Sequence, residues 1–229
     1  MLKKILFALT AVLILVSSYL VFFYAQVPIN PQETGANPND FKIFYFHLPI
    51  AISSYLAFAI VFIASVLYLR SKQQKWDIAA VSAAEVGVIL TFLTLVSGSV
   101  WIRAGAWACN CWWVPWDVRL NTSLVLFLIY LSYLMVRQAV EEPEKRARLS
   151  AVFGIVGFIG VPLSYMSIRL WTKATLHPVM EFHPTSNMLL TILLNFAAYF
   201  LLVVLLIVLK IGNEQLKEKL NEIKREKGL

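Results

Sequence analysis

Charged side chains are scarce in this sequence. Asp, Glu, Lys and Arg make up 14% of its 229 residues, whereas soluble domains carry about 25%. Hydrophobic residues make up 59%, and the mean hydropathy is +0.72. A chain of this composition has too little polar surface to cover itself in water, which excludes an ordinary soluble protein and indicates a membrane protein.

The sequence contains several long runs of apolar residues. A membrane-spanning helix needs about 20 mostly apolar residues, and six runs qualify: roughly 5–25, 43–69, 78–101, 119–136, 149–169 and 187–209. The first run resembles a signal peptide, but it exceeds the usual apolar core of about 7–15 residues and has no clear cleavage motif, so we interpret it as a retained anchor. The sequence therefore predicts an all-α integral membrane protein with six transmembrane helices in one domain, 1–229.

The basic residues predict the orientation of these helices. If the N-terminus lies inside, the inner segments hold 15 of the 20 Lys and Arg residues, and the outer segments hold only Lys42, Arg103, Arg119, Arg169 and Lys173. Cytoplasmic loops carry such an excess, so both termini are expected in the cytoplasm. The net charge of +7 follows from this topology and requires no nucleic acid partner.

Motifs of nucleotide-binding and hydrolytic enzymes are missing. The sequence contains no Walker motif, Rossmann fingerprint, nucleophile elbow or internal repeat. Residues 212–229 place three apolar side chains at helical spacing among charges, which predicts an amphipathic cytoplasmic tail.

Glu85 lies about two turns inside the third run. It either serves a gate, proton path or partner contact, or forms a neutral hydrogen bond to a neighbouring helix.

Histidine is also rare, and all three histidines fall on the outer side: His47, His177 and His183. None lies in the middle of a span, unlike the paired ligands of four-helix cytochromes b. A neutral imidazole is a good axial ligand for haem iron, and two imidazoles from different loops can clamp one macrocycle. The alternative is that each histidine is an ordinary surface or interface residue.

Tryptophan is concentrated in the second outer loop, 102–118. Four of the seven tryptophans fall within ten residues there: Trp107, Trp112, Trp113 and Trp116. Tryptophans also form belts at membrane interfaces, and Trp101 and Trp171 fit that interpretation. Belts spread their rings over many helix ends, so a flat hydrophobic ligand with polar edges is the other explanation. A porphyrin fits this description better than a quinone does.

The residues around this loop have several possible roles. Asp117 is expected to anchor the return into the fourth span, because a carboxylate is favourable at a helix N-terminus. Arg119 either shares this role or pairs with a propionate. Cys109 and Cys111 lie on a side that permits disulfides. They can form a disulfide, bind a metal or stay free, and a single pair is a weak metal signal.

The segments WWVPWDVRLNTS, IFYFHLP (43–49) and TLHP (175–178) resemble the tryptophan-rich "WWD" haem-handling proteins of cytochrome c biogenesis. Within this superfamily the chain is similar to the six-span CcmC family. AEVG and SGSVW match its third helix, and VGFIGVPLSYMSIRLW matches its fifth. The resemblance covers roughly residues 40 to 180.

The resemblance implies a protein of the bacterial inner membrane that holds haem b on its periplasmic face and passes it to the periplasmic haem chaperone CcmE. A small membrane protein, CcmD, and the ABC transporter subunits CcmA and CcmB are the implied partners. This function is the presentation of haem rather than classical catalysis. His47 and His177 match the axial ligands, with His183 as a competing second ligand. The tryptophan-rich segment that holds the haem matches Trp107, Trp112, Trp113, Trp116 and Asp117.

The chain departs from the family pattern in its loop. Four residues, 108–111, separate the first tryptophan from the paired ones, and Val114-Pro115 precede the final Trp-Asp, so the loop is longer than usual.

Two other functions remain open. A membrane haem or quinone oxidoreductase subunit would use the same histidines, although none lies in the middle of a span. A transporter subunit would place Glu85 on its path, although one intramembrane charge gives this little support.

Overall fold

The computed structural model describes residues 1–25, 38–106, 111–177 and 185–227. Within these ranges every regular element is helical, and six helical stretches are long and apolar enough to cross a membrane, as the sequence predicts. The helices are α1 (Leu2–Phe23), α3 (Phe44–Ser71), α4 (Gln74–Trp101), α5 (Val118–Ala139), α6 (Pro143–Gly157), α7 (Gly160–Leu170) and α8 (Ser186–Glu226). Three short helical segments, η1 (Pro38–Ile43), η2 (Ile102–Ala106) and η3 (Thr172–Ala174), lie beside the loops.

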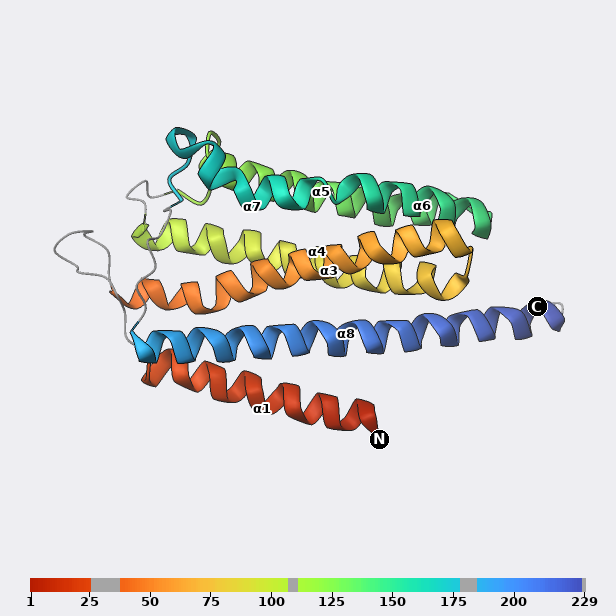
Figure 1. Cartoon of the computed structure of the whole chain (residues 1–229), viewed down its shortest axis with the longest axis horizontal. Coiled ribbons are helices and arrows are strands. Elements are labelled where there is room, and N and C mark those ends of the chain that lie inside the picture. Colours follow the sequence, from red (N-terminus) through yellow and green to blue (C-terminus); the bar gives the residue numbers. More distant parts are fainter. Residues whose placement is uncertain (26–37, 107–110, 178–184, 228–229) are drawn as a thin grey trace.

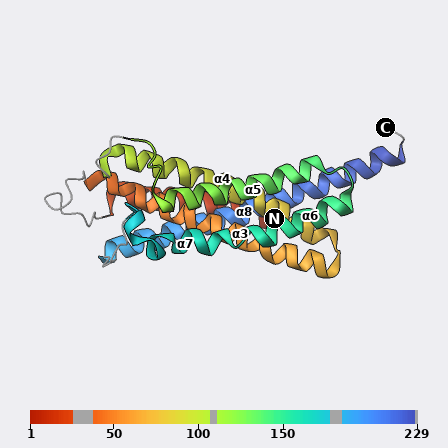
Figure 2. The ribbon, with the colours of Figure 1, turned by 90° about the horizontal axis from the view of Figure 1, so that it is seen from above.

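The long helices run side by side along one axis (Figures 1 and 2). Both chain termini point to the same end of the bundle, which we call the terminal end. The starts of α3, α5 and α8 lie at the opposite end, which we call the loop end. The segment after Trp101 and the segment that carries His177 therefore meet at the loop end, although they are far apart in the sequence.

The core is built around α3 and α4, which are joined by a two-residue turn and pack along their length. Small side chains allow the close approach, among them the buried Ala57, Ala83 and Ala84. Close contact of this kind is what holds helices together in lipid, where water does not drive them together. The rings of Phe58 and Tyr130 stack with centroids 3.6 Å apart, which joins α5 to the same core.

The fifth span differs from the single helix expected over 149–169. It consists of α6 and α7, which are separated by a break at Phe158 and Ile159. Pro162 explains the break, because proline has no N–H for the helical ladder and its ring clashes with the carbonyl four residues earlier. The two helices together still form one apolar span, Pro143–Leu170.

Gly154 of α6 permits close packing against α3. A Cβ at this position would lie 2.7 Å from Ser65 Oγ and 3.0 Å from Val61 Cγ1. We expect Gly154→Ala to lower the free energy of unfolding by about 1–3 kcal/mol through overpacking. The thermal midpoint of the detergent-purified protein would report the loss. Gly212→Ala is the matched control, since its Cβ meets only the flexible end of Lys3, and an equal effect of both variants would contradict the explanation.

The last span continues without interruption into the tail, so the amphipathic helix expected over 212–229 is the end of α8. Leu216, Leu220 and Ile223 are exposed on it. Earlier in α8, Lys210 makes an ion pair with Glu85 of α4. The carboxylate is thus balanced by a cation from a neighbouring helix, and its role in the described structure is to join α4 to α8.

Candidate functional site

Two cavities meet at the loop end. A small cavity lies between α4 and α5, and a larger one of about 350 Å³ is lined by α3, α7 and α8. Four side chains line both cavities: His47, Trp101, Arg119 and His177. They come from the start of α3, the end of α4, the start of α5 and the segment after η3. The fold therefore brings together the two histidines that the sequence singles out, which are 130 positions apart.

The larger cavity is mainly apolar. Its volume falls within the range of about 300–1,000 Å³ that is usual for small-molecule sites. Two cations, Arg119 and Arg169, line it, and no carboxylate is among its described lining residues. The apolar wall consists mainly of Phe44, Leu48, Ala51, Ile52, Ile168, Ile192 and Phe196. A ligand that suits this cavity has a large apolar body and negative charge at one edge, and it can be coordinated by an imidazole nitrogen.

A hydrogen bond fixes the ring of His47. Its Nδ1 lies 2.9 Å from the hydroxyl oxygen of Ser97, one turn before the end of α4. The Ser97 hydroxyl has a single proton and lies 2.8 Å from the Leu93 carbonyl oxygen, which can only accept. The arrangement favours the tautomer in which His47 Nδ1–H donates to Ser97. The lone pair of Nε2 then remains for a metal, as in many metal-binding histidines.

The neighbours of Ser97 complete the pocket for this ring. Gly98 leaves room for the imidazole, since a Cβ there would lie 3.3 Å from His47 Cε1. The Trp101 ring meets the imidazole edge-on, with centroids 6.0 Å apart and planes at 69°. Together Ser97, Gly98 and Trp101 hold the imidazole orientation from one face of α4.

Ser97→Ala tests the role of this hydrogen bond. Haem is the ligand that the family resemblance implies for this site. We expect the variant to bind haem about 10–100-fold more weakly, because the His47 ring loses its fixed tautomer and orientation. Titration with haem, followed by its visible absorption, measures the change. Ser99→Ala is the control, since Ser99 lies on the same helix outside both cavities. Unchanged affinity in Ser97→Ala would show that the hydrogen bond does not tune His47.

Asp117 ties the two outer segments together. Its side chain is fully buried, and its Oδ1 accepts a hydrogen bond from the Leu120 N–H at the start of α5. Its Oδ2 accepts from the Thr175 hydroxyl at 2.9 Å and from the Leu176 N–H at 2.6 Å. The His177 N–H in turn donates to the Thr175 hydroxyl oxygen at 3.0 Å. Asp117 is therefore the helix cap that the sequence predicts and, in addition, a positioning residue for His177.

Arg119 faces the histidines from α5. One of its Nη1 hydrogens goes to the backbone carbonyl of Ser164 in α7. A guanidinium has five N–H donors in a planar fork, so donors remain for a carboxylate in either cavity. The contact with α7 and the position in the wall of both cavities make Arg119 both an anchor and a cation available to an anionic ligand.

The tryptophans of the loop do not line the two cavities in the part of the chain that is described. The side chains of Trp112 and Trp116 are 60% and 56% exposed. Trp113 is half-buried and packs against Ile102, Val114 and Leu120. Trp107, predicted to hold the haem, and the competing axial ligand His183 lie outside the described residues, as does Cys109. Cys111 is disulfide-bonded, and among the described residues it belongs to no group of three or more side chains that could hold a metal ion.

Ser97, Gly98 and Trp101 are not among the site residues that the sequence predicts. The sequence favours an interfacial belt for Trp101, whereas the structure places this ring beside His47. The signal was present in the spacing, because Thr94, Gly98 and Trp101 are three and four residues apart and so share one face of a helix. The partner of that face, however, cannot be deduced from one helix alone.

Comparison with known proteins places the chain among haem-related membrane proteins. The family model described as "Heme exporter protein C" (CcmC) matches residues 1–226. The chain is 33% identical over 207 residues to heme exporter protein C of Bradyrhizobium diazoefficiens, covering 85% of this chain and 76% of the relative. It is 30% identical over 185 residues to heme exporter protein C of Paracoccus denitrificans, covering 78% and 75%. It is also 32% identical over 184 residues to a putative cytochrome c biosynthesis ccmC-like mitochondrial protein of Marchantia polymorpha, covering 78% and 75%.

Proposed function

The chain belongs to the heme exporter protein C family, and on this premise we propose that it is a haem-handling membrane protein of cytochrome c maturation. It holds haem as cargo at the loop end of the bundle, between His47 and His177, and passes it to a periplasmic haem chaperone. The observation that carries the proposal is that these two histidines line the same pair of cavities together with Arg119 and Trp101.

The chemistry of the cavity residues suits a haem. Two neutral imidazoles are good axial ligands for its iron, and the Ser97 contact prepares one of them. The apolar walls of the larger cavity match the porphyrin face, while Arg119 and Arg169 match the negative propionates. The protein orients the haem and excludes water from it. The cargo that fits the family and these residues best is haem b, whose iron is bound only through its axial ligands.

The exposed tryptophans have a separate role in this proposal. Trp112 and Trp116 present flat apolar rings outside the cavities, beside Asp117. Such rings support one edge of a haem that extends beyond the cavity, or an acceptor that approaches it. With Trp107, Trp113 and the anchoring Asp117, they form the tryptophan-rich segment that contacts the haem in this proposal and leaves one edge of it accessible.

The orientation and the partners follow from charge and family. The excess of basic residues at the terminal end supports cytoplasmic termini, which puts the histidines on the periplasmic side of a bacterial inner membrane. The chain is one membrane domain over 1–229, with 212–229 in the cytoplasm. CcmE is the proposed haem acceptor, and CcmD, CcmA and CcmB are the proposed membrane partners.

The first test is a visible spectrum of the detergent-purified protein from cells supplied with haem. We expect a Soret band with the α and β bands of iron bound by two imidazoles. After purified CcmE is added and the two proteins are separated, this haem absorbance should be found with CcmE. A protein that stays colourless, even with CcmE co-expressed, would refute the proposal. Reversible reduction by quinol without a need for CcmE would instead indicate a membrane oxidoreductase.

A further inference from the structure

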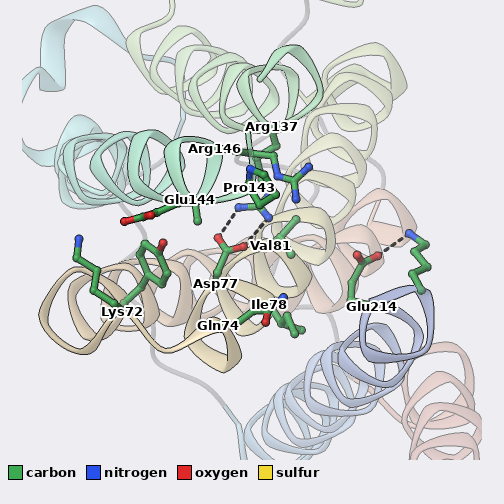
Figure 3. A pocket seen from close by; sticks show the side chains of 13 residues that line it. Lys72, Gln74, Asp77, Ile78, Val81, Arg137, Pro143, Glu144, Arg146 and Glu214 are labelled. Carbon is green, nitrogen blue, oxygen red and sulfur yellow. Dashed lines mark hydrogen bonds and ion pairs between the residues drawn. The ribbon is translucent and has the colours of Figure 1, made fainter. Parts of the chain in front are cut away.

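A further cavity lies at the terminal end, far from the histidines. Its volume is about 670 Å³, and it is lined by the end of α3, the start of α4, the end of α5, the start of α6 and the extension of α8 (Figure 3). This cavity has no role in the proposed haem handling. Its wall is mixed, with seven charged side chains and with the apolar side chains of Ile78 and Val81, one turn apart on α4.

The charges in this cavity do not balance. Four cations line it, Lys72, Arg137, Arg146 and Lys217, against three carboxylates, Asp77, Glu144 and Glu214. Two ion pairs are formed within the set. Arg137 donates to both Asp77 oxygens at 2.5 and 2.8 Å, and Lys217 lies 2.6 Å from Glu214. The third carboxylate, on Glu144, points away from Arg137 and Arg146 in Figure 3.

Arg146 is the side chain that most needs a ligand. Its Nε is buried and has no hydrogen-bond partner among the described residues. A buried guanidinium donor without an acceptor costs free energy, and this one lines the same cavity as the guanidinium of Arg137. An anion between the two arginines would satisfy the donor and relieve the repulsion between them.

Lys72, at the end of α3, has an unusual backbone conformation. It is the single non-glycine residue with a positive φ in the described chain, at φ 56° and ψ 16°. This left-handed conformation is unfavourable for a side chain with a Cβ, and glycine or asparagine usually occupies it at a helix end. Strain of this kind, where it is kept, points to a function of the side chain. The Lys72 ammonium lies over the Tyr68 ring, at the edge of the cavity.

The helix ends favour the same kind of ligand. α4 begins at Gln74 and α6 begins at Pro143, and both residues line the cavity. Neither helix has a side-chain hydrogen bond at its N-cap. Each first turn also carries one carboxylate, Asp77 in α4 and Glu144 in α6, so the excess of basic side chains is the main attraction for an anion and the helix ends add partial positive charge.

We propose that this cavity binds the phosphate of an anionic phospholipid headgroup. The phosphate lies at Arg146, beside Arg137, while Lys72 adds positive charge from the end of α3. The glycerol and acyl chains leave past Ile78 and Val81. The cavity sits where the spans end, which is the depth of lipid headgroups, and basic pockets between helices on the cytoplasmic side bind such headgroups. The bound lipid joins α3, α4, α6 and the extension of α8.

The test compares lipids added to the full-length protein in an uncharged detergent. We expect dioleoylphosphatidylglycerol to bind about tenfold more tightly than dioleoylphosphatidylcholine, as measured by native mass spectrometry and by the rise in thermal midpoint. Arg146→Gln should abolish this preference. Arg148→Gln should keep it, because Arg148 is exposed on the same helix and does not line the cavity.

A second variant separates binding from folding. Lys72→Gly removes the charge, and glycine adopts the left-handed conformation without strain. Its thermal midpoint without lipid should therefore be no lower than that of the wild type. Its preference for phosphatidylglycerol should nevertheless fall. Inorganic phosphate should compete weakly with the lipid, and if it binds as tightly as the lipid does, the source is a soluble phosphate and the lipid assignment is overturned. Equal binding of both lipids to the wild type, or loss of the preference in Arg148→Gln as well, would also overturn it.

Discussion

Replacement of either axial histidine should remove most of the haem from the purified protein. We expect His47→Ala and His177→Ala each to lower haem content at least about tenfold, because each imidazole supplies one of only two protein bonds to the iron. The residual haem should show a shifted Soret band, typical of iron with one protein ligand. Absorption spectra of the pyridine haemochrome, normalised to protein, give the amounts.

Two controls distinguish ligation from folding. Imidazole added to His177→Ala should restore the spectrum of the wild type, since the free base can occupy the vacant axial position. His183→Ala should keep its haem, because the structure brings His177 to the cavities beside His47. If His183→Ala loses haem while His177→Ala retains it, His183 is the ligand and the assignment of His177 is wrong.

Asp117→Ala should have the second largest effect. The variant removes three hydrogen bonds from a fully buried carboxylate, including the cap of α5. Loss of the cap alone costs about 1 kcal/mol, and each hydrogen bond to the charged group contributes about 1.5–3 kcal/mol. We expect a clearly lower thermal midpoint. Haem affinity should fall about 10–100-fold, as for other residues that position metal ligands.

Asp117→Asn separates the two roles of this residue. Asparagine is a good helix cap, so its Oδ1 can still accept from the Leu120 N–H. Its amide NH₂ then faces the Thr175 hydroxyl and the Leu176 N–H, and it cannot accept from the latter. The asparagine variant should therefore regain the cap, about 1 kcal/mol relative to the alanine variant, but bind haem as weakly as the alanine variant. Wild-type haem affinity in Asp117→Asn would show that the link to the His177 segment is not needed.

The fold was largely predictable because membrane spans are long and uniform in composition. Hydropathy located all six spans. The positions of the basic residues predict which ends of the spans lie on the same side of the membrane. Hydropathy did not locate the break between α6 and α7, since a window of about 20 residues averages over Phe158 and Ile159. The local signal there was Pro162, which has no effect on hydropathy but interrupts the helical hydrogen bonds.

The site was predictable in its residue types but not in its geometry. His47, His177 and Arg119 stand out because titratable side chains are few at the outer ends of the spans, and the structure brings these three together. Which tryptophans share their cavity depends on how helices rotate against one another. Rotation of α4 turns Trp101 inward, whereas the loop leaves Trp112 and Trp116 exposed. A single sequence carries no record of that rotation.

The position of Asp117 also determines where this loop can change in length during evolution. The bonds to Leu120 and Leu176 fix the chain at the C-terminal side of the tryptophans, directly before α5. Residues added between Trp101 and Val114 precede that fixed point, so they do not shift the register of His177 against His47. Residues 108–111, at which the chain departs from the pattern of the family it resembles, fall in this interval. Insertions and deletions should accumulate there among relatives, while the distance in sequence from Asp117 to Arg119 stays constant.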